Sequence, residues 1–191
     1  MDRRKYIKTV LSVLGISIAS FPVIKYFYVS ATFVEKDLWV KKPIIAELAD
    51  MIIPLTDSIG AKAAMVEDYI VIVLLNCHSK RQQQRFLSGI KDLEDYAKTI
   101  LGRDFLKCTE TEKVKVLQYF ADKGSSSSVF LNKLEDKLFG QRFFLKLRTL
   151  TVEGYCQSML GATQGLAYEA VPGVYVSCTS LDTFQKSWAT K

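Results

Sequence analysis

The residues of this 191-residue chain that could perform catalysis form no recognisable catalytic motif, and adjacent carboxylates such as Glu94-Asp95 and Glu135-Asp136 are explained by solvated helix faces. His78 is the only histidine, which excludes metal sites that need two or more histidine ligands, and no sequence pattern around it indicates a serine–histidine triad. We expect it in a solvated loop between two helices. Ser158 lacks the glycines of a nucleophile elbow, and neither a phosphate-binding loop nor a dinucleotide fingerprint is present. We therefore predict no catalytic, cofactor-binding or metal-binding residue.

The four cysteines are Cys77, Cys108, Cys156 and Cys178, and no pair has the Cys-x-x-Cys spacing of a zinc, redox or haem site. Their spacing does not distinguish the three possible full pairings. Cys156 and Cys178 flank a segment that we expect to be irregular, and an oxidising compartment favours disulfides. These two are therefore our disulfide candidates, either with each other or from one of them to a partner chain. Four free thiols are the third possibility.

Arg3 and Arg4 begin a segment that looks like a twin-arginine export signal. An apolar run from Val10 to Ile24 follows, about fifteen residues long, which suits a signal better than a membrane span of about 20 residues. We predict that residues 1–31 bring the chain to the twin-arginine export machinery, which exports folded proteins, and so to the periplasm. An ordinary secretory signal is the alternative. If it is not cleaved, this segment could remain as a membrane anchor.

The charge of the chain argues against a nucleic-acid partner. The net charge is +6, but residues 1–28 contain five basic residues and one acidic residue. This leaves only +2 for the rest of the chain. Hydrophobic residues make up 49% and charged residues 24%, which are ordinary values for a globular domain. We therefore predict one domain, residues 43–191, after a polar connector over residues 32–42.

The hydrophobic pattern predicts an all-α fold with an irregular C-terminal segment. Helices should begin at Pro43, Val66, Ser79 and Thr109. They should end before Pro54, at Cys77, at Leu101 before Gly102, and at Asp122 before Gly124. The β-branched run in the second of these could also be a strand. Further helices are predicted from Val129 toward Gly140, over residues 143–152, and in the tail, where Phe184 and Trp188 are spaced i, i+4.

The stretch from Phe143 to Cys178 organises the chain. After its helical first half, glycines at 154, 161, 165 and 173 and a proline at 172 interrupt any regular element. The stretch nevertheless keeps many large apolar side chains, so we expect it to be fixed to a surface, either the chain's own core or a partner's. Our candidate interface anchors are Tyr155, Tyr168 and Tyr175, with Pro172 and Gly173 holding the last in place.

Two blocks of sequence carry a family likeness. The first runs from Glu47 to Pro54 and continues with Thr56-Asp57, Gly60-Ala61 and Val66 to Ile70. The second contains Phe143-Phe144, Leu147, Gly154-Tyr155, Gly161, Tyr168, Pro172-Gly173 and Cys178. In this order they resemble the gluconate 2-dehydrogenase subunit 3 family, over about residues 43–188. The chain departs from the family pattern at Ile59 and Glu67, where proline is common, and at Met65, where glycine is usual. These departures leave the sugar substrate and the identity of the partner open.

The resemblance implies a non-catalytic small subunit that forms a heterodimer with a large FAD-dependent dehydrogenase of the glucose–methanol–choline (GMC) class. In this family the flavin lies in the large subunit, and a c-type cytochrome often takes the electrons onward. The large subunit commonly leaves the cytoplasm folded, with its FAD, by means of the small subunit's twin-arginine signal. The alternative is a free-standing, membrane-anchored envelope protein that binds or scaffolds without an enzyme partner.

Overall fold

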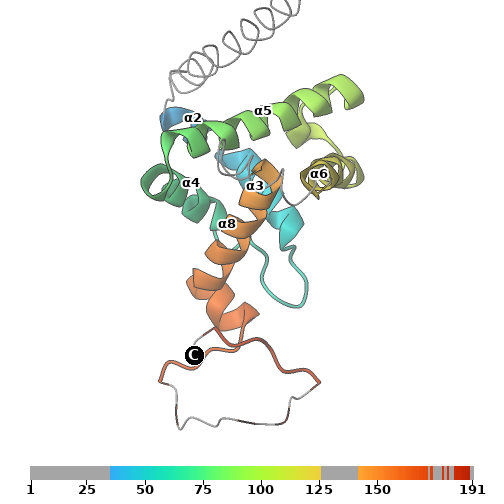
Figure 1. Cartoon of the computed structure of the whole chain (residues 1–191). Helices are drawn as coiled ribbons and strands as arrows, with labels where there is room; N and C mark the ends of the chain where they lie inside the picture. The colour runs from blue at the N-terminus through green and yellow to red at the C-terminus, as the bar shows by residue number, and fades with distance from the viewer. Residues whose placement is uncertain are drawn as a thin grey trace, which may run out of the picture. The chain divides into compact units, whose positions relative to one another are not determined.

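The computed structural model describes residues 35–125, 142–171, 173, 178, 180 and 183–189. The all-α prediction is confirmed: no strand is present in these ranges, and the one β-contact is an isolated bridge. The described elements are α2 (Glu35–Val40), α3 (Lys42–Ile52), α4 (Val66–Cys77), α5 (Lys80–Leu101), the 3₁₀ turn η1 (Phe105–Lys107), α6 (Glu110–Ser125), α8 (Phe143–Gln157) and the π-turn η2 (Gly161–Gly165) (Figure 1).

Helix α8 is the element against which the other long helices pack. It contacts α3, α4, α5 and α6, and in Figure 1 α4 and α6 lie on either side of it. Leu147, Leu150 and Thr151 on α8 are fully or almost fully buried. The burial of apolar side chains provides most of the free energy of folding, at about 25 cal/mol per Å². The core is therefore centred on a helix from the C-terminal half of the chain.

The predicted helix ends follow from local capping signals. Ser79 is the N-cap of α5, and its N–H donates to the side-chain oxygen of Gln82 at 3.3 Å. Gly102 ends this helix in the left-handed conformation that suits glycine, with φ of 67°. Before α6, the N–H of Thr109 donates to the carboxylate of Glu112 at 2.8 Å, as the capping box predicts. The prediction of helix over strand for residues 66–77 is confirmed as well.

A buried glutamine from the next helix completes the C-terminus of α4. The side-chain amide nitrogen of Gln83 donates to the carbonyl oxygens of Leu74 (2.7 Å), Leu75 (3.1 Å) and His78 (3.0 Å). The last carbonyls of a helix have no partners within the helix. Gln83 therefore fixes where α4 ends and how α5 lies against it.

Four predictions about the elements need correction. Residues 35–40 of the expected connector form α2, because Leu38 is fully buried where α2 meets α3 and α4. Helix α6 continues to Ser125, past the predicted end at Asp122. Helix α8 continues through Gly154 to Gln157. Residues 183–189 contain a turn and extended chain where a tail helix was predicted. The predicted helix over residues 129–140 lies outside the described residues.

Gly154 lies in α8 because the helix packs closely on α4 there. A Cβ at this position would come within 2.7 Å of the Tyr69 ring and 3.0 Å of Val66. Glycine usually costs helix stability, by about 1 kcal/mol relative to alanine. Here it lets two helices approach each other, so tertiary packing outweighs the local propensity.

Candidate functional site

Tyr155, one of the predicted interface anchors, is part of the chain's own core. Its side chain is only 6% exposed, and its hydroxyl donates to the carbonyl oxygen of Ile59 at 2.7 Å. This bond ties the end of α8 to the loop between α3 and α4. The competing explanation, that the rings of this stretch pack onto the chain's own helices, therefore holds for Tyr155.

The π-turn η2 folds over Tyr155 by means of two glycines. A Cβ at Gly165 would lie 2.2 Å from the Tyr155 hydroxyl, and one at Gly161 would lie 2.0 Å from the Tyr155 carbonyl oxygen. Ser158 secures the turn, since its hydroxyl donates to the Tyr155 carbonyl at 2.8 Å and accepts from the N–H of Gly161 at 2.9 Å. Tyr155 thus fixes the position from which the chain continues after α8.

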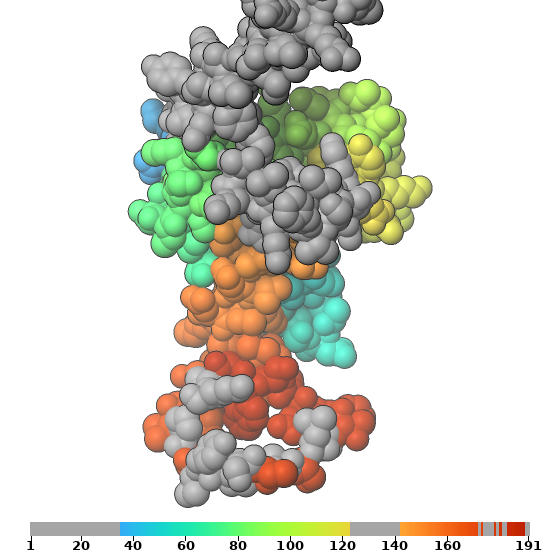
Figure 2. Space-filling model, viewed as in Figure 1, coloured from blue at the N-terminus to red at the C-terminus, as the bar shows by residue number. Residues whose placement is uncertain are grey.

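The described residues from Ser158 to Ala189, which we call the C-terminal segment, expose large apolar side chains. Figure 2 shows its red atoms beyond the orange end of α8, on the face drawn. Tyr168 is 48% exposed, Trp188 is 51% exposed and Phe184 is 90% exposed; Met159 and Val171 are exposed as well. Several large apolar side chains that are exposed on one short segment are typical of an interaction site. The C-terminal segment is therefore the candidate interface.

Two distant parts of this segment lie side by side. The N–H of Ala167 donates to the carbonyl of Ser187 at 2.9 Å, and the N–H of Ala189 donates to the carbonyl of Ala167 at 2.8 Å. These bonds form a parallel bridge between Ala167 and Trp188. The ammonium of Lys186 also donates to the carbonyl of Gln164 at 2.7 Å. Residues 186–189 are thereby held beside η2.

Of the other predicted site residues, Gly173 and Cys178 are exposed. Pro172, Tyr175 and the export residues Arg3 and Arg4 lie outside the described residues. Tyr168 is exposed at the candidate interface, so it is accessible to a partner, unlike Tyr155.

All four cysteines are free thiols in the structure. Cys77, Cys156 and Cys178 are exposed, whereas Cys108 is buried, and this burial raises its pKa. The thiol of Cys108 donates weakly to the carbonyl of Asp104 at 3.5 Å. Cys156 and Cys178 are not bonded to each other here, and both are accessible to a partner.

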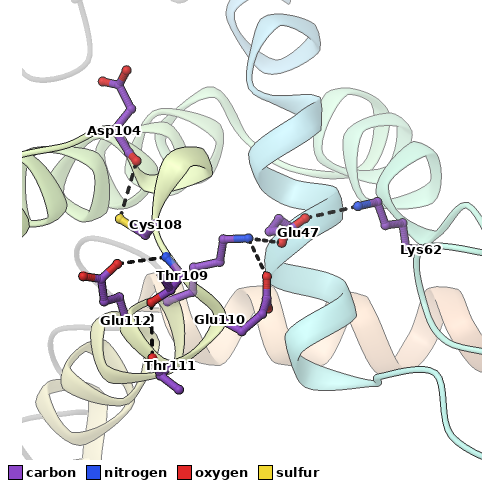
Figure 3. A network of polar contacts seen from close by, with 9 residues as sticks. Glu47, Lys62, Asp104, Cys108, Thr109, Glu110, Thr111 and Glu112 are labelled. Atoms are coloured by element: carbon purple, nitrogen blue, oxygen red, sulfur yellow. Dashed lines mark hydrogen bonds and ion pairs between the residues drawn. The ribbon is translucent and has the colours of Figure 1, made fainter.

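An ion-pair network joins α3 to α6 at a half-buried position (Figure 3). The ammonium of Lys113, whose side chain is 7% exposed, binds the carboxylates of Glu47 and Glu110, the latter at 2.8 Å. Glu47 also pairs with Lys62 at 3.1 Å. The hydrogen bond from Lys113 lowers the pKa of Glu47. Burial alone would lower the pKa of Lys113, but its bonds to Glu110 and Glu47 outweigh burial and raise it. Each charge of the network therefore has a partner within the fold.

No pattern in the sequence indicates this network. Glu47 and Lys113 are 66 positions apart in the sequence, and no local sequence motif connects them. Only the packing of α3 and α6 brings them together. The sequence of an isolated helix contains no signal for such a pair.

His78 is half-buried, whereas a solvated loop residue was expected. Its Nδ1 lies 3.2 Å from the side-chain oxygen of Gln82, and its Nε2 is buried without a partner among the described residues. Burial, and then the charge of Lys146, lowers the pKa of His78. Burial also lowers the pKa of Lys146. The histidine is therefore kept neutral at pH 7, at the junction of α4 and α5.

An open apolar groove of about 320 Å³ lies between α3, α6 and α8. Its lining is mainly apolar; it consists of Met51, Ile52, Val114, Leu117, Gln118, Ala121, Phe144 and Arg148. Ligand sites usually add several convergent polar groups that fix the orientation of the ligand.

Across the described ranges, no three histidine, cysteine or acidic residues cluster closely enough to hold a metal ion. In the same ranges, no helix is both long enough and apolar enough to cross a membrane.

Comparison with known proteins gives one match. The sequence model of the family described as gluconate 2-dehydrogenase subunit 3 matches residues 41–173. This range begins just before α3 and ends within the C-terminal segment, so it includes every described long helix. No curated protein and no solved structure matches significantly.

Proposed function

Because the chain belongs to the gluconate 2-dehydrogenase subunit 3 family, we propose that it is the non-catalytic small subunit of a periplasmic, FAD-dependent sugar or sugar-acid dehydrogenase. The family match establishes a subunit of a gluconate dehydrogenase complex. The proposal adds the chain's tasks: it binds a GMC-type flavin subunit, stabilises it and brings it to the twin-arginine export machinery.

The family match over residues 41–173 is the observation on which the proposal depends. The exposed C-terminal segment is consistent with it. Large apolar side chains such as Trp188 and Tyr168 contribute much of the binding energy at protein interfaces, because they bury a rigid ring while keeping a polar atom accessible. In contrast, the polar clusters in the body of the domain, such as that of Glu47 and Lys113, are paired within the fold.

The division of labour within the complex follows from this assignment. We assign the FAD to the large subunit, and the onward transfer of electrons to a c-type cytochrome where one is present. The chain's own contribution is a surface on which the flavin subunit is held, and an N-terminal signal with Arg3 and Arg4 that both subunits share.

Affinity purification from the native host tests the proposal. The chain would carry a tag on a flexible linker after Lys191, and the co-purified proteins would be identified by mass spectrometry. We expect a second polypeptide with the absorbance of bound flavin and with dye-linked oxidation of gluconate or a related sugar. Purification of the chain alone, or with proteins that bind no flavin, would favour the free-standing envelope protein.

A second experiment examines the interface by comparing binding with folding. Tyr168→Ala truncates an exposed ring and should leave the circular dichroism of the domain unchanged. Truncation of such an anchor typically costs about 2 kcal/mol of binding energy, roughly thirtyfold in affinity. The control is Tyr69→Ala on α4. The Tyr69 ring packs against Gly154 of α8, so its loss should lower the stability of the helical core rather than remove a contact with the partner. If the folded Tyr168→Ala chain binds with unchanged affinity, Tyr168 is not an anchor.

A further inference from the structure

The isolated parallel bridge in the C-terminal segment pairs two short stretches of the same chain, residues 166–168 and 187–189, which we call the ribbon. Ala167 bonds through both its N–H and its carbonyl to Ser187 and Ala189, the two neighbours of Trp188. This is the evenly spaced hydrogen-bond pattern of parallel strands. The ribbon therefore has a defined register and two edges.

The backbone of Trp188 faces the open edge of this ribbon. In a strand, the backbone groups that bond to one neighbour alternate along the chain with those that face the other side. Because Ser187 and Ala189 bond to Ala167, the N–H and carbonyl of Trp188 point away from it. Neither group has a hydrogen-bond partner among the described residues. An edge of this kind is a template for another strand.

The type of partner follows from these unpaired backbone groups. The exposed rings of Trp188 and Tyr168 alone could suit either a lipid surface or a protein. A lipid bilayer, however, leaves extended backbone donors and acceptors unsatisfied, at several kcal/mol for each group. A β-strand from another protein satisfies them and provides pockets for alternate side chains. A two-stranded ribbon is also only marginally stable by itself, and a third strand would stabilise it.

We propose that the Trp188 edge of this ribbon pairs with an edge β-strand of the dehydrogenase subunit, so that the partner's sheet extends onto the small subunit. The identity of the partner rests on the proposed function. The backbone of Trp188 provides one donor and one acceptor to the new strand, and its ring covers the junction.

Two substitutions at position 188 separate the backbone from the side chain. Trp188→Ala removes the ring and keeps the N–H. Trp188→Pro removes both, and proline is compatible with an edge position where the N–H points outward. The matched pair Phe184→Ala and Phe184→Pro makes the same change at an exposed residue outside the ribbon. All four variants should keep the circular dichroism of the helical domain, since neither residue is in its core.

Affinity for the purified dehydrogenase subunit is the measurement. We expect Trp188→Pro to bind about five- to tenfold more weakly than Trp188→Ala, the loss expected for one hydrogen bond. The two Phe184 variants should bind equally. Hydrogen exchange at the Trp188 amide should also be slower in the complex than in the free chain. Equal affinity of the two Trp188 variants, together with unchanged exchange, would overturn strand pairing alone. Failure of the unaltered chain to bind any flavin dehydrogenase would overturn the proposed function itself.

Discussion

The hydroxyl of Tyr155 lies where a side chain at Gly165 would have to be, at 2.2 Å from the position of a Cβ there. Gly165→Ala should therefore displace η2 or the ring and destabilise the fold by about 1–3 kcal/mol. Tyr155→Phe keeps the ring and removes the bond to Ile59, which should cost about 1 kcal/mol. Thermal unfolding would measure both. Gly173→Ala is the control, because a Cβ there meets nothing within 4 Å. Equal stability of the two alanine variants would contradict this packing.

The ion pairs of Lys113 should make a measurable contribution to stability. Lys113→Met leaves the exposed Glu110 in water and leaves Glu47 paired only with Lys62, so we expect a loss of about 1–3 kcal/mol, as for hydrogen bonds to charged groups. Lys107→Met breaks an exposed pair with Asp104 and should cost less than about 1 kcal/mol. Urea unfolding of both variants is the measurement. Similar midpoints for the two would show that the half-buried network contributes no more than a surface pair.

The same network predicts how stability depends on acidity. Glu47 has a pKa below its ordinary 4.5 in the folded chain, so the stability that it gives is complete above pH 4.5. It is lost as the pH falls through the lowered pKa, where Glu47 takes up a proton. Glu47→Gln should therefore be less stable than the unaltered chain at pH 7, and the difference should shrink below pH 4.5. A difference that stays constant down to pH 2 would assign the stabilisation to other carboxylates.

Met65 has a left-handed backbone conformation, with φ of 53°, at the start of α4. This conformation costs a residue with a side chain roughly 1–2 kcal/mol, whereas glycine adopts it freely. Glycine also increases the entropy of the unfolded chain, which offsets about 0.4–1 kcal/mol. We expect Met65→Gly to stabilise the chain by up to about 1 kcal/mol, and Met65→Ala not to do so. A lower melting temperature for the glycine variant would show that the Met65 side chain contributes more than the strain costs.

Alkylation should divide the cysteines according to burial. In the folded free chain, iodoacetamide should modify Cys77, Cys156 and Cys178, while Cys108 should react only after unfolding. In the complex, we predict that either Cys156 or Cys178 forms a disulfide with the partner and is therefore no longer alkylated. This bond should give a heavier band on non-reducing electrophoresis that disappears with reductant. Full labelling of both cysteines in the complex would contradict the intersubunit disulfide.

Export should depend on the paired arginines. Arg3→Lys with Arg4→Lys preserves the charge of the leader but should leave both this chain and its dehydrogenase partner in the cytoplasm. The control is Lys5→Arg with Lys8→Arg, which keeps both the charge and the arginine pair. Cell fractionation with an assay of periplasmic dehydrogenase activity gives the result. Normal periplasmic activity in the Arg3/Arg4 variant would indicate a different export route.

The features that could be predicted from sequence depend on neighbouring residues. Both ends of α4, the start of α5 at Ser79, its end at Gly102 and the capping box before α6 follow from local patterns, and all are confirmed. The features that were missed depend on distant residues. Tyr155 bonds to a carbonyl 96 positions away, and Gly154 remains helical because Tyr69 packs against it. Local propensity contains no information about either contact.

The candidate site shows the same division. The glycines and aromatic rings after α8 predict a contact surface, but they do not distinguish rings that face inward from rings that face outward. Tyr155 and Tyr168 both belong to this stretch, yet one is buried and the other is half exposed. The difference arises because η2 folds back over Tyr155 before the chain reaches Tyr168.

The position of α8 at the centre of the core has a consequence for synthesis. Its last residue, Gln157, is made about a hundred positions after the end of α3. At typical translation rates this delay is on the order of 5–20 s. Until then, α3, α4, α5 and α6 lack the helix against which they all pack. The proposed export signal, residues 1–31, would be complete long before the domain can fold, while the apolar faces of these helices are still uncovered. We expect chains that stop before Phe143 to be bound by chaperones, and ribosome profiling of chaperone-bound nascent chains would show whether this binding ends once α8 has emerged.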